Sequence, residues 1–446
     1  MVRAWRMGGG RIFGGPRLSI RSGDQGRVKE LSHSGRAAAF LGAVMLLFCA
    51  VGVSGAVAQG ASPFRSFLES LWPEAKALGV SRATFDKAFA GLNPDLSLPD
   101  LVIPGRAEQQ SAQAEFTKAP QDYISKSYIE RLAKRGRELL SQHRATLERI
   151  EAESGVNPYA VLAIWGRETA FGAHRLGHDA IRVLATQAYV GRRKELFRTE
   201  LLHALKMLED GVPRADMRSS WAGAMGLTQF LPTEFYKHGR DHDGDGRIDL
   251  FGSIPDALAS AARQLEGKGW VRGQTWGYEV RVPPTADCSL EGPGQARSLG
   301  EWAKLGFRRA FGRPWPEELL GAEAYLMMPA GGYGPAFLVL ENYRVIRRYN
   351  TSDLYAVFVG HLADRIAGGG DFETPCCTAG PQRTRTIEGI QKRLGEIGYD
   401  IEKIDGKVGS NTRRQIGAYQ KASNLKIDCW PSDTLLAHMM RNSTTR

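Results

Sequence analysis

"VLAIWGRETAFG", residues 161–172, is an apolar stretch with one acid in it. At 3.6 residues per turn, Val161, Trp165 and Glu168 fall on one stripe of the predicted helix, so the acid points the same way as the apolar residues. A carboxylate that faces a core is costly unless it is neutral, paired or catalytically active. Burial disfavours the charged form of a carboxylate and therefore suits a proton donor. The pattern leaves two interpretations of Glu168: a general acid, or a structural acid bound to a buried Arg.

No spacing in the sequence pairs Glu168 with a second carboxylate. The neighbouring charge, Arg167, is one residue away and therefore faces another side of the helix. Two-carboxylate glycosidases need a nucleophile or a base opposite the acid. A solitary buried Glu therefore favours chemistry in which the substrate supplies the second group.

Helical periodicity extends through most of the chain and predicts a mainly α fold. Ser81 follows a break in the first helical segment and is expected to cap the helix after it. The region 270–316 has weaker helix signals, and "WGYEVRVPP" at 276–284 is able to form a short strand. The segments with helical spacing are 63–91, 120–155, 156–172, 187–211 and 254–270. The segment 336–366 begins as a strand or turn and continues as a helix.

The first 58 residues have the composition of a secretory signal. An Arg-rich opening precedes the apolar run "AAAFLGAVMLLFCAVGVSGAVAQG" at 37–60, and Ala56-Val57-Ala58 fits an A-x-A cleavage site. An uncleaved N-terminal anchor is the alternative interpretation. Cys49 lacks the small residues expected before a lipidated cysteine, so we do not predict a lipoprotein. We expect an exported protein, cleaved near Ala58.

Charge and cysteine content limit the possible partners. The 446-residue chain has a formal net charge of +11, and residues 1–58 hold eight Lys/Arg and two Asp/Glu, so cleavage leaves about +5. Such mild basicity suits an anionic polymer such as a cell wall and is too weak to indicate nucleic acid. Four cysteines remain, with spacing unlike that of a zinc site, and we expect disulfides without a predicted pairing. These are Cys288, Cys376, Cys377 and Cys429.

The motif "RSSWAGAMGLTQFLPT" at 218–233 alternates small residues with larger ones. Small residues let a backbone approach a ligand closely, while Ser220, Thr228 and Gln229 offer hydrogen bonds. A tight structural turn explains the same pattern, and on this motif alone it is the stronger interpretation.

The acidic run "DHDGDGRIDLF" at 241–251 has the spacing of an EF-hand calcium loop. Position 12, where a bidentate Glu is expected, is Gly252. Either Asp256 supplies that carboxylate from the next helix, or the site is weak; a solvated acidic turn is the alternative. The expected ligands are Asp241 at position 1, Asp243 at 3, Asp245 at 5 and the carbonyl of Arg247 at 7, with Asp249 at position 9.

These motifs together resemble the lytic murein transglycosylase B family, from about residue 63 to 367. The resemblance rests on "ETAFG" at 168–172, the motif within 219–233, the acidic loop, Gly269-Trp270 and "RYN" at 348–350. It implies a lysozyme-like helical catalytic domain that cleaves the β-1,4 bond between N-acetylmuramic acid (MurNAc) and N-acetylglucosamine (GlcNAc) in peptidoglycan.

The resemblance also implies roles for individual residues. Glu168 would protonate the glycosidic oxygen, then accept the proton of the MurNAc C6 hydroxyl as a 1,6-anhydro ring closes. Ser220 and Gln229 would line the sugar site, and Tyr349 would close the pocket. Catalysis would need no cofactor. The EF-hand-like loop, with Asp256 as its last carboxylate, would hold a structural calcium.

The C-terminal segments "IQKRLGEIGY" at 390–399 and "IDGKVGSNTRRQIGAYQKASNL" at 404–425 resemble the peptidoglycan-binding domain type 1, a three-helix module. The match weakens at 428–431. A stretch rich in Gly, Pro, Thr and charge precedes the module and is the best linker in the chain. The predicted organisation is a signal peptide at 1–58, a catalytic domain at 60–370, a linker at 371–384 and a peptidoglycan-binding domain at 385–442.

The resemblance favours a lytic transglycosylase over two alternatives. A muramidase-type hydrolase would cut the same bond with water, and a non-catalytic wall-binding protein would keep only the fold. The expected partners are peptidoglycan glycan strands and other wall enzymes, with no nucleic acid. Because the expected mature chain starts at Gln59 and not at a lipidated cysteine, we predict a soluble periplasmic form without a stable membrane anchor.

Overall fold

The computed structural model describes residues 62–106, 116, 118–376, 378–381 and 383–441. The predicted signal sequence and its cleavage site near Ala58 lie outside these residues. Within the described ranges, none of the helices has both the length and the apolar character needed to cross a bilayer.

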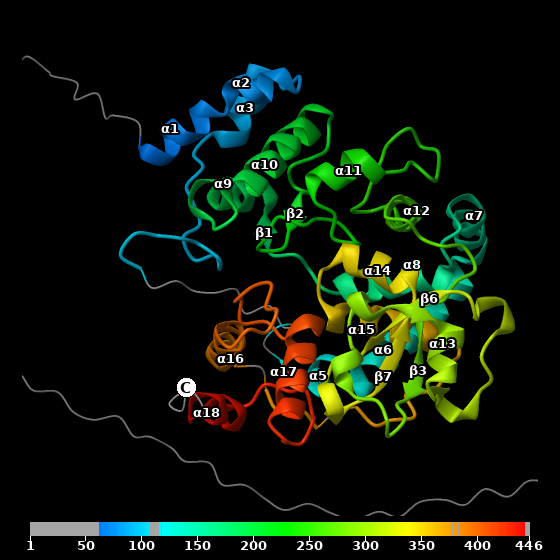
Figure 1. Ribbon diagram of the computed structural model, residues 1–446. Helices are drawn as coiled ribbons and strands as arrows, with labels where there is room; N and C mark the ends of the chain where they lie inside the picture. The colour runs from blue at the N-terminus through cyan, green and yellow to red at the C-terminus, as the bar shows by residue number, and fades with distance from the viewer. Residues whose placement is uncertain (1–61, 107–115, 117, 377, 382, 442–446) are drawn as a thin grey trace, which may run out of the picture. The chain divides into compact units, whose positions relative to one another are not determined.

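The described chain is mainly helical, which confirms the predicted fold class (Figure 1). The helices up to residue 267 are α1 (Pro63–Ser70), α2 (Trp72–Ala77), α3 (Arg82–Phe89), α5 (Pro120–Tyr123), α6 (Lys126–Gln142), α7 (Arg144–Ser154), α8 (Pro158–Thr169), α9 (Ala180–Val190), α10 (Lys194–Glu209), α11 (Pro232–His238) and α12 (Ile254–Gly267). Later helices are α13 (Leu299–Lys304), α14 (Glu341–Tyr349), α15 (Asp353–Ile366), α16 (Thr384–Glu396), α17 (Ser410–Ala422) and α18 (Asp433–Arg441). Short 3₁₀ turns are η1 (Cys288–Leu290), η2 (Pro293–Gln295), η3 (Ala310–Gly312), η4 (Glu317–Leu319) and η5 (Gly331–Tyr333).

Side-chain caps fix where several helices begin. The Ser81 hydroxyl accepts a hydrogen bond from the Thr84 backbone N–H, as its position before α3 predicts. Asn157 caps α8, the helix that carries Glu168, by accepting from the Ala160 backbone N–H at 2.8 Å. Ser352 caps α15 in the same way. Polar residues at these positions therefore end one segment and start the next.

A five-stranded antiparallel sheet, in the order β4-β6-β7-β3-β5, lies among the helices. Alternate residues of β6 and β7 face opposite sides, and both faces are buried: Tyr325 and Phe337 join one apolar cluster, Leu326 and Leu338 another. The sequence predicted a strand near 276–284 and not this sheet. Its strands are β3 (Gly277–Arg281), β4 (Arg297–Ser298), β5 (Arg308–Arg309), β6 (Glu323–Met327) and β7 (Ala336–Val339), while β1 (His178–Asp179) pairs separately with β2 (Arg218–Ser219).

Helices α8 and α15 pack against each other in the main apolar cluster, together with α6, α7, α12 and α14. The N-terminal helices α1–α3 pack on α9 and α10 in a separate cluster (Figure 1). Because α8 is buried from Ala160 to Gly166, its position is fixed before its last turn reaches the surface. The core therefore holds the helix that carries Glu168 rigidly.

Of the four cysteines expected in the mature chain, Cys288 and Cys429 form a disulfide across 141 residues of sequence. The bond joins η1 of the sheet region to the segment before α18. Cys376 is also disulfide-bonded, and Cys377 lies outside the described residues.

Candidate active site

Glu168 lies in the last turn of α8 and is half-buried. The helix ends because Ala170, Phe171 and Gly172 all take left-handed backbone conformations. The Thr169 hydroxyl donates to the Leu227 carbonyl at 2.7 Å and accepts from the Gly172 N–H at 3.1 Å, which holds this unusual turn in place. Backbone strain of this kind is typical of functional sites.

Gly166 lets the chain fold back after the turn. A Cβ at this position would lie 2.7 Å from the Phe171 ring, which packs edge-on against Trp165 with ring centroids 5.4 Å apart. Gly166 and Phe171 thus close the end of α8 and leave Glu168, the first residue of "ETAFG", at its margin.

The Tyr355 hydroxyl, from the first turn of α15, donates a hydrogen bond to Glu168 Oε1. Burial and the neighbouring Glu168 carboxylate raise the pKa of Tyr355 well above its usual value, so the hydroxyl keeps its proton. The sequence does not reveal Tyr355 as a partner of Glu168, because Tyr355 lies 187 residues away and has no motif of its own.

The Arg167 side chain lies among aromatic rings, including that of Tyr355 at 5.8 Å. Its guanidinium donates to the Tyr123 hydroxyl, with Nε at 3.1 Å, and lies over the rings of Tyr123 and Phe358 at 4.8 and 5.2 Å. Burial lowers the pKa of Arg167, but Tyr123 and Glu168 outweigh burial and raise it, so Arg167 stays charged. A permanent cation therefore stands on the residue next to the acid.

Ser220 and Gln229 belong to a tightly folded loop. The Ser220 hydroxyl accepts from the backbone N–H groups of Ala222 and Ala224 at 3.4 and 3.3 Å. Gln229 has a left-handed backbone, with φ of 58°, and its side-chain amide donates to the Gly226 carbonyl at 3.2 Å. Both predicted sugar-binding side chains therefore also stabilise the turn.

The glycines of this loop are needed for packing. A Cβ at Gly223 would lie 2.3 Å from a Leu184 methyl group, and one at Gly226 would lie 2.6 Å from the Leu250 carbonyl oxygen. Both glycines also have positive φ angles. The small residues thus serve a tight turn, which is the interpretation that the motif alone favours.

Tyr349 connects this loop to the acid. It ends α14, and its hydroxyl donates to the Thr228 carbonyl, next to Gln229. Burial and the charge of Glu168 raise the pKa of Tyr349 well above its usual value. Tyr349 therefore lies within electrostatic range of Glu168, on the side where the loop contacts the end of α8.

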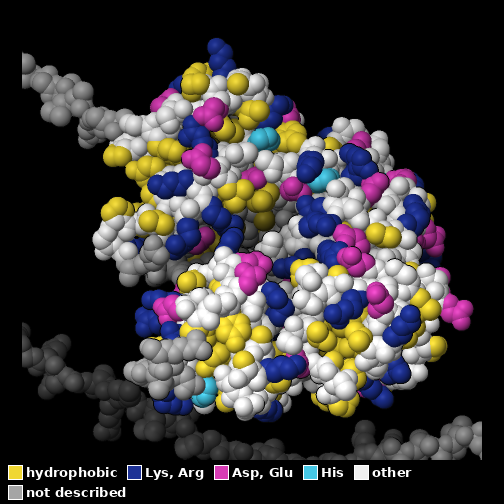
Figure 2. All heavy atoms as spheres, viewed as in Figure 1, with side chains coloured by type: hydrophobic (Ala, Val, Ile, Leu, Met, Phe, Trp, Pro, Cys, Tyr) yellow, Lys and Arg dark blue, Asp and Glu magenta, His cyan; other side chains and the backbone are white. Residues whose placement is uncertain are grey.

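A cavity of about 450 Å³ opens beside the last residue of α8. Its lining includes Thr169, Arg175, Arg218 and Leu227. On the face shown in Figure 2, Lys and Arg side chains are interspersed with Asp and Glu.

The acidic loop brings Asp241, Asp243 and Asp256 together, with ligand oxygens within 4.8 Å of one another. Asp256, in the first turn of α12, is buried and accepts backbone N–H groups of His242 at 2.7 Å and Asp249 at 2.9 Å. The Asp241 oxygens accept from two glycine N–H groups of the loop. The oxygen-only set fits a hard cation such as calcium.

Gly252 has a steric reason at position 12 of the loop. A Cβ there would lie 2.9 Å from Asp249 Oδ2, whose partner oxygen accepts from the Phe251 and Gly252 N–H groups. A Glu would displace that turn. Asp256, four residues after Gly252, is the carboxylate that lies beside Asp241 and Asp243.

Comparison with known proteins identifies two regions. The transglycosylase SLT domain model matches residues 63–364, and a peptidoglycan binding domain model matches residues 385–439. SltB3 from Pseudomonas aeruginosa, solved in complex with NAG-anhNAM-pentapeptide, is 40% identical, with a TM-score of 0.77 covering 84% of this chain and 99% of that one.

Two Escherichia coli relatives are more distant. The membrane-bound lytic murein transglycosylase B is 31% identical over 232 residues, which are 51% of this chain and 62% of that protein. The match thus spans less than two thirds of this curated relative. The lytic transglycosylase Slt35, solved in complex with calcium, is 23% identical, with a TM-score of 0.53 covering 69% of this chain and 93% of that one. This last likeness concerns the fold.

The transglycosylase model covers more than half of the chain, and the solved relatives share its lysozyme-like fold, so the family resemblance predicted from the sequence is confirmed. The chain belongs to the transglycosylase SLT domain family, whose matched relatives are lytic transglycosylases, and it carries a C-terminal peptidoglycan binding domain.

Proposed function

We propose that this chain is a lytic transglycosylase that cleaves the β-1,4 bond between MurNAc and GlcNAc in peptidoglycan and leaves a 1,6-anhydro-MurNAc end. The observation that carries the proposal is the pair formed by Glu168 and Tyr355. A half-buried carboxylate held by a neutral hydroxyl has a fixed orientation and can still exchange a proton with a substrate.

Glu168 acts twice in the proposed reaction. As an acid it protonates the glycosidic oxygen while the C1–O bond breaks, and the GlcNAc unit leaves with a hydroxyl at C4. As a carboxylate it then accepts the proton of the MurNAc C6 hydroxyl while O6 bonds to C1. The proton balance closes on one residue, and the substrate provides the nucleophile.

Ser220, Gln229 and Tyr349 are proposed to bind the sugar. In support, Tyr349 and Gln229 flank Thr228, and the preceding residue, Leu227, contacts the end of α8 and lines the neighbouring cavity. Ser220 lies at the start of the same loop. Their hydrogen bonds within the loop fix their orientation before a ligand arrives, which lowers the entropy cost of binding.

Mass spectrometry of digested peptidoglycan tests the proposal. Wild-type protein should release anhydro-muropeptides, and Glu168→Gln should not. Reducing ends in place of anhydro ends would indicate the hydrolase alternative. Absence of any soluble product from wild type would indicate a wall-binding protein without catalysis.

Asp241, Asp243, Asp245, the Arg247 carbonyl and Asp256 are proposed to hold a structural calcium. The clustered oxygens of three of these residues support this, as does the burial of Asp256, whose carboxylate accepts the backbone N–H groups of His242, Asp243 and Asp249. Calcium would tie the loop to α12 and take no part in the reaction. A calorimetric titration of the mature protein with calcium, described with its variants below, checks the assignment.

The remaining proposals concern location and organisation. A signal peptide at 1–58 would direct the chain to the periplasm as a soluble form without a stable membrane anchor. Residues 60–370 would form the catalytic domain, 371–384 a linker and 385–442 a wall-binding domain that raises the local substrate concentration. The partners would be glycan strands and other wall enzymes, with no nucleic acid. Sequencing the N-terminus of the exported protein checks the cleavage site.

A further inference from the structure

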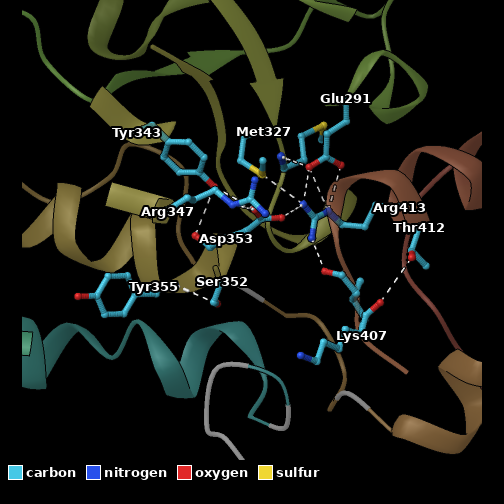
Figure 3. A network of polar contacts seen from close by, with 12 residues as sticks. Glu291, Met327, Tyr343, Arg347, Ser352, Asp353, Tyr355, Lys407, Thr412 and Arg413 are labelled. Carbon is cyan, nitrogen blue, oxygen red and sulfur yellow. Dashed lines mark hydrogen bonds and ion pairs between the residues drawn. The ribbon is translucent and has the colours of Figure 1, made fainter. Parts of the chain in front are cut away.

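Arg413, in α17 of the peptidoglycan binding domain, reaches into the catalytic part of the chain (Figure 3). Its side chain is 1% exposed. The guanidinium donates to Glu291, with Nη2 at 2.6 Å from Oε1, and to Asp353 Oδ2 at 2.9 Å. Its third nitrogen, Nη1, donates to the Val408 carbonyl at 2.7 Å. One arginine thus joins two carboxylates that lie outside its own domain.

Asp353 is the first residue of α15, the helix that carries Tyr355. Its second oxygen lies 3.0 Å from Arg347 Nε and 3.3 Å from the Tyr343 hydroxyl. The capping residue Ser352 accepts from the Tyr355 N–H in the same turn. Arg413 therefore holds the helical turn from which the Tyr355 hydroxyl reaches Glu168. Figure 3 shows the part of this chain of contacts that runs from Arg413 through Asp353 to the turn of Ser352 and Tyr355.

Other bonds hold the domain in place independently of Arg413. The Cys288–Cys429 disulfide joins it covalently to η1. The Gly332 N–H donates to the Asp428 carbonyl at 2.8 Å, and the Tyr333 hydroxyl donates to the Asp428 carboxylate at 2.7 Å. A change at Arg413 is therefore expected to alter the α15 turn without releasing the domain.

We propose that Arg413 of the peptidoglycan binding domain is a positioning residue for catalysis, which acts through Asp353 and the first turn of α15 to fix the Tyr355–Glu168 hydrogen bond. This inference rests on the proposed function. It gives the C-terminal domain a second role beside wall binding: part of the support for the catalytic acid comes from the domain that binds the polymer.

The test variant must avoid unpaired buried charge. Arg413→Ala alone would leave Glu291 buried without its cation, which by itself is strongly destabilising. The double variant Arg413→Met with Glu291→Gln removes the link, keeps an acceptor for the Met328 N–H, and leaves Asp353 paired with Arg347. Thermal unfolding of the full chain verifies that it folds.

The experiment measures kcat and KM for anhydro-product release from soluble glycan strands, at a temperature well below the unfolding midpoint. The double variant should lose about tenfold in kcat, equal to about 1.4 kcal/mol, with KM unchanged. In a Tyr355→Phe background the same double substitution should change kcat less than twofold, because the hydroxyl it positions is already absent. Lys421→Met is the matched control, since Lys421 makes an exposed contact with Asp287, 3.4 Å away across the same junction, and should leave both constants unchanged.

Equal losses of kcat in the two backgrounds would overturn the proposal, as would an unchanged kcat in a folded double variant. If the double variant does not fold, Arg413→Lys takes its place in the same cycle, because a lysine cannot reproduce the two-carboxylate fork. A wild-type chain that releases no anhydro-muropeptides would overturn the proposed function, and the role of Arg413 with it.

Discussion

Glu168 and Glu291 are acids of the same type in two opposite settings. Glu168 is half-buried at the end of α8 and accepts from a neutral tyrosine hydroxyl. Glu291 is fully buried and accepts from the Arg413 guanidinium and the Met328 N–H. The structural acid bound to a buried Arg, which the sequence allowed at Glu168, is found at Glu291. Access and the charge of the partner, more than residue type, separate an acid suited to chemistry from one that holds the fold.

The largest expected effect separates the two acids by rate. Glu168→Gln should reduce anhydro-muropeptide release at least about 10³-fold, because one group is expected to serve as both acid and base. The unfolding midpoint should change little, since Tyr355 can still donate to the amide oxygen. Product release by mass spectrometry and thermal unfolding are measured on the same preparation. If Glu168→Gln still released anhydro-muropeptides, Glu168 would not be the catalytic acid and the contrast with Glu291 would not hold.

The second prediction concerns Glu291, the fully buried acid, and removes its partner Arg413. Arg413→Ala should lower the free energy of unfolding by about 3–5 kcal/mol, because it leaves an uncompensated buried charge. Burial raises the pKa of Glu291 to about 7 even with Arg413 present, so loss of the cation would favour its neutral form further. Denaturant unfolding at pH 7.5 measures the loss.

The control for this prediction is Arg383→Ala, just before the same domain. Its ion pair with Asp433 is 67% and 61% exposed, and exposed pairs contribute about 0–1 kcal/mol. Similar losses of unfolding free energy for the two variants would mean that burial does not distinguish the two ion pairs. The structural role given to Glu291 would then be wrong.

Local features of the molecule could be predicted, and long-range pairings could not. The cap at Ser81, the acidic loop and the presence of Asp256 beside it follow from spacings of a few residues. Tyr355 meets Glu168 across 187 residues, and Arg413 meets Glu291 across 122. No local periodicity encodes such contacts, because they depend on how the elements pack.

The sheet was missed for a different physical reason. Its strands contain two to five residues, and β6 and β7 are buried on both faces. Such strands lack the alternation of apolar and polar residues that identifies a half-exposed strand. The run "AFLVL" at 336–340 therefore fitted either a strand or a turn.

The third prediction extends the comparison to a buried base, His361. Its ring is 5% exposed and stacks on Phe372 with ring centroids 3.9 Å apart. Burial, and then the charge of Arg365, lower the pKa of His361 to about 4, although Asp371 opposes this. The folded state therefore favours the neutral ring, whereas the unfolded chain binds a proton near pH 6.5.

The sign of the pH effect follows from that difference. The stabilisation is complete above pH 6.5 and is lost as the pH falls toward 4, by at most about 3 kcal/mol. Unfolding free energies from pH 7.5 to 4 should therefore fall less steeply in His361→Gln than in wild type, and the two curves should run parallel above pH 6.5. Parallel curves over the whole range would show that the pKa of His361 does not differ between the folded and unfolded states.

The smallest expected effect concerns Asp256, an acid that is buried as completely as Glu291 but has backbone N–H donors in place of an arginine. A buried carboxylate that lies beside two further aspartates and accepts backbone N–H groups is the reason to expect a cation. Calcium at ten times its dissociation constant should stabilise the chain by about 1.4 kcal/mol, and chelation should remove that gain.

Asp245→Asn should weaken calcium binding in calorimetry, because it removes a proposed ligand. The substitution should leave the loop folded, since the exposed Asp245 side chain accepts from the Arg247 N–H and an asparagine oxygen can do the same. Asp400→Asn, 81% exposed in the peptidoglycan binding domain, should not weaken calcium binding. If millimolar calcium produced neither binding heat nor stabilisation, backbone N–H groups alone would be sufficient partners for the buried Asp256 carboxylate. A buried acid would then need no charged partner. The distinction between Glu168 and Glu291 would rest on solvent access and not on the charge of the partner.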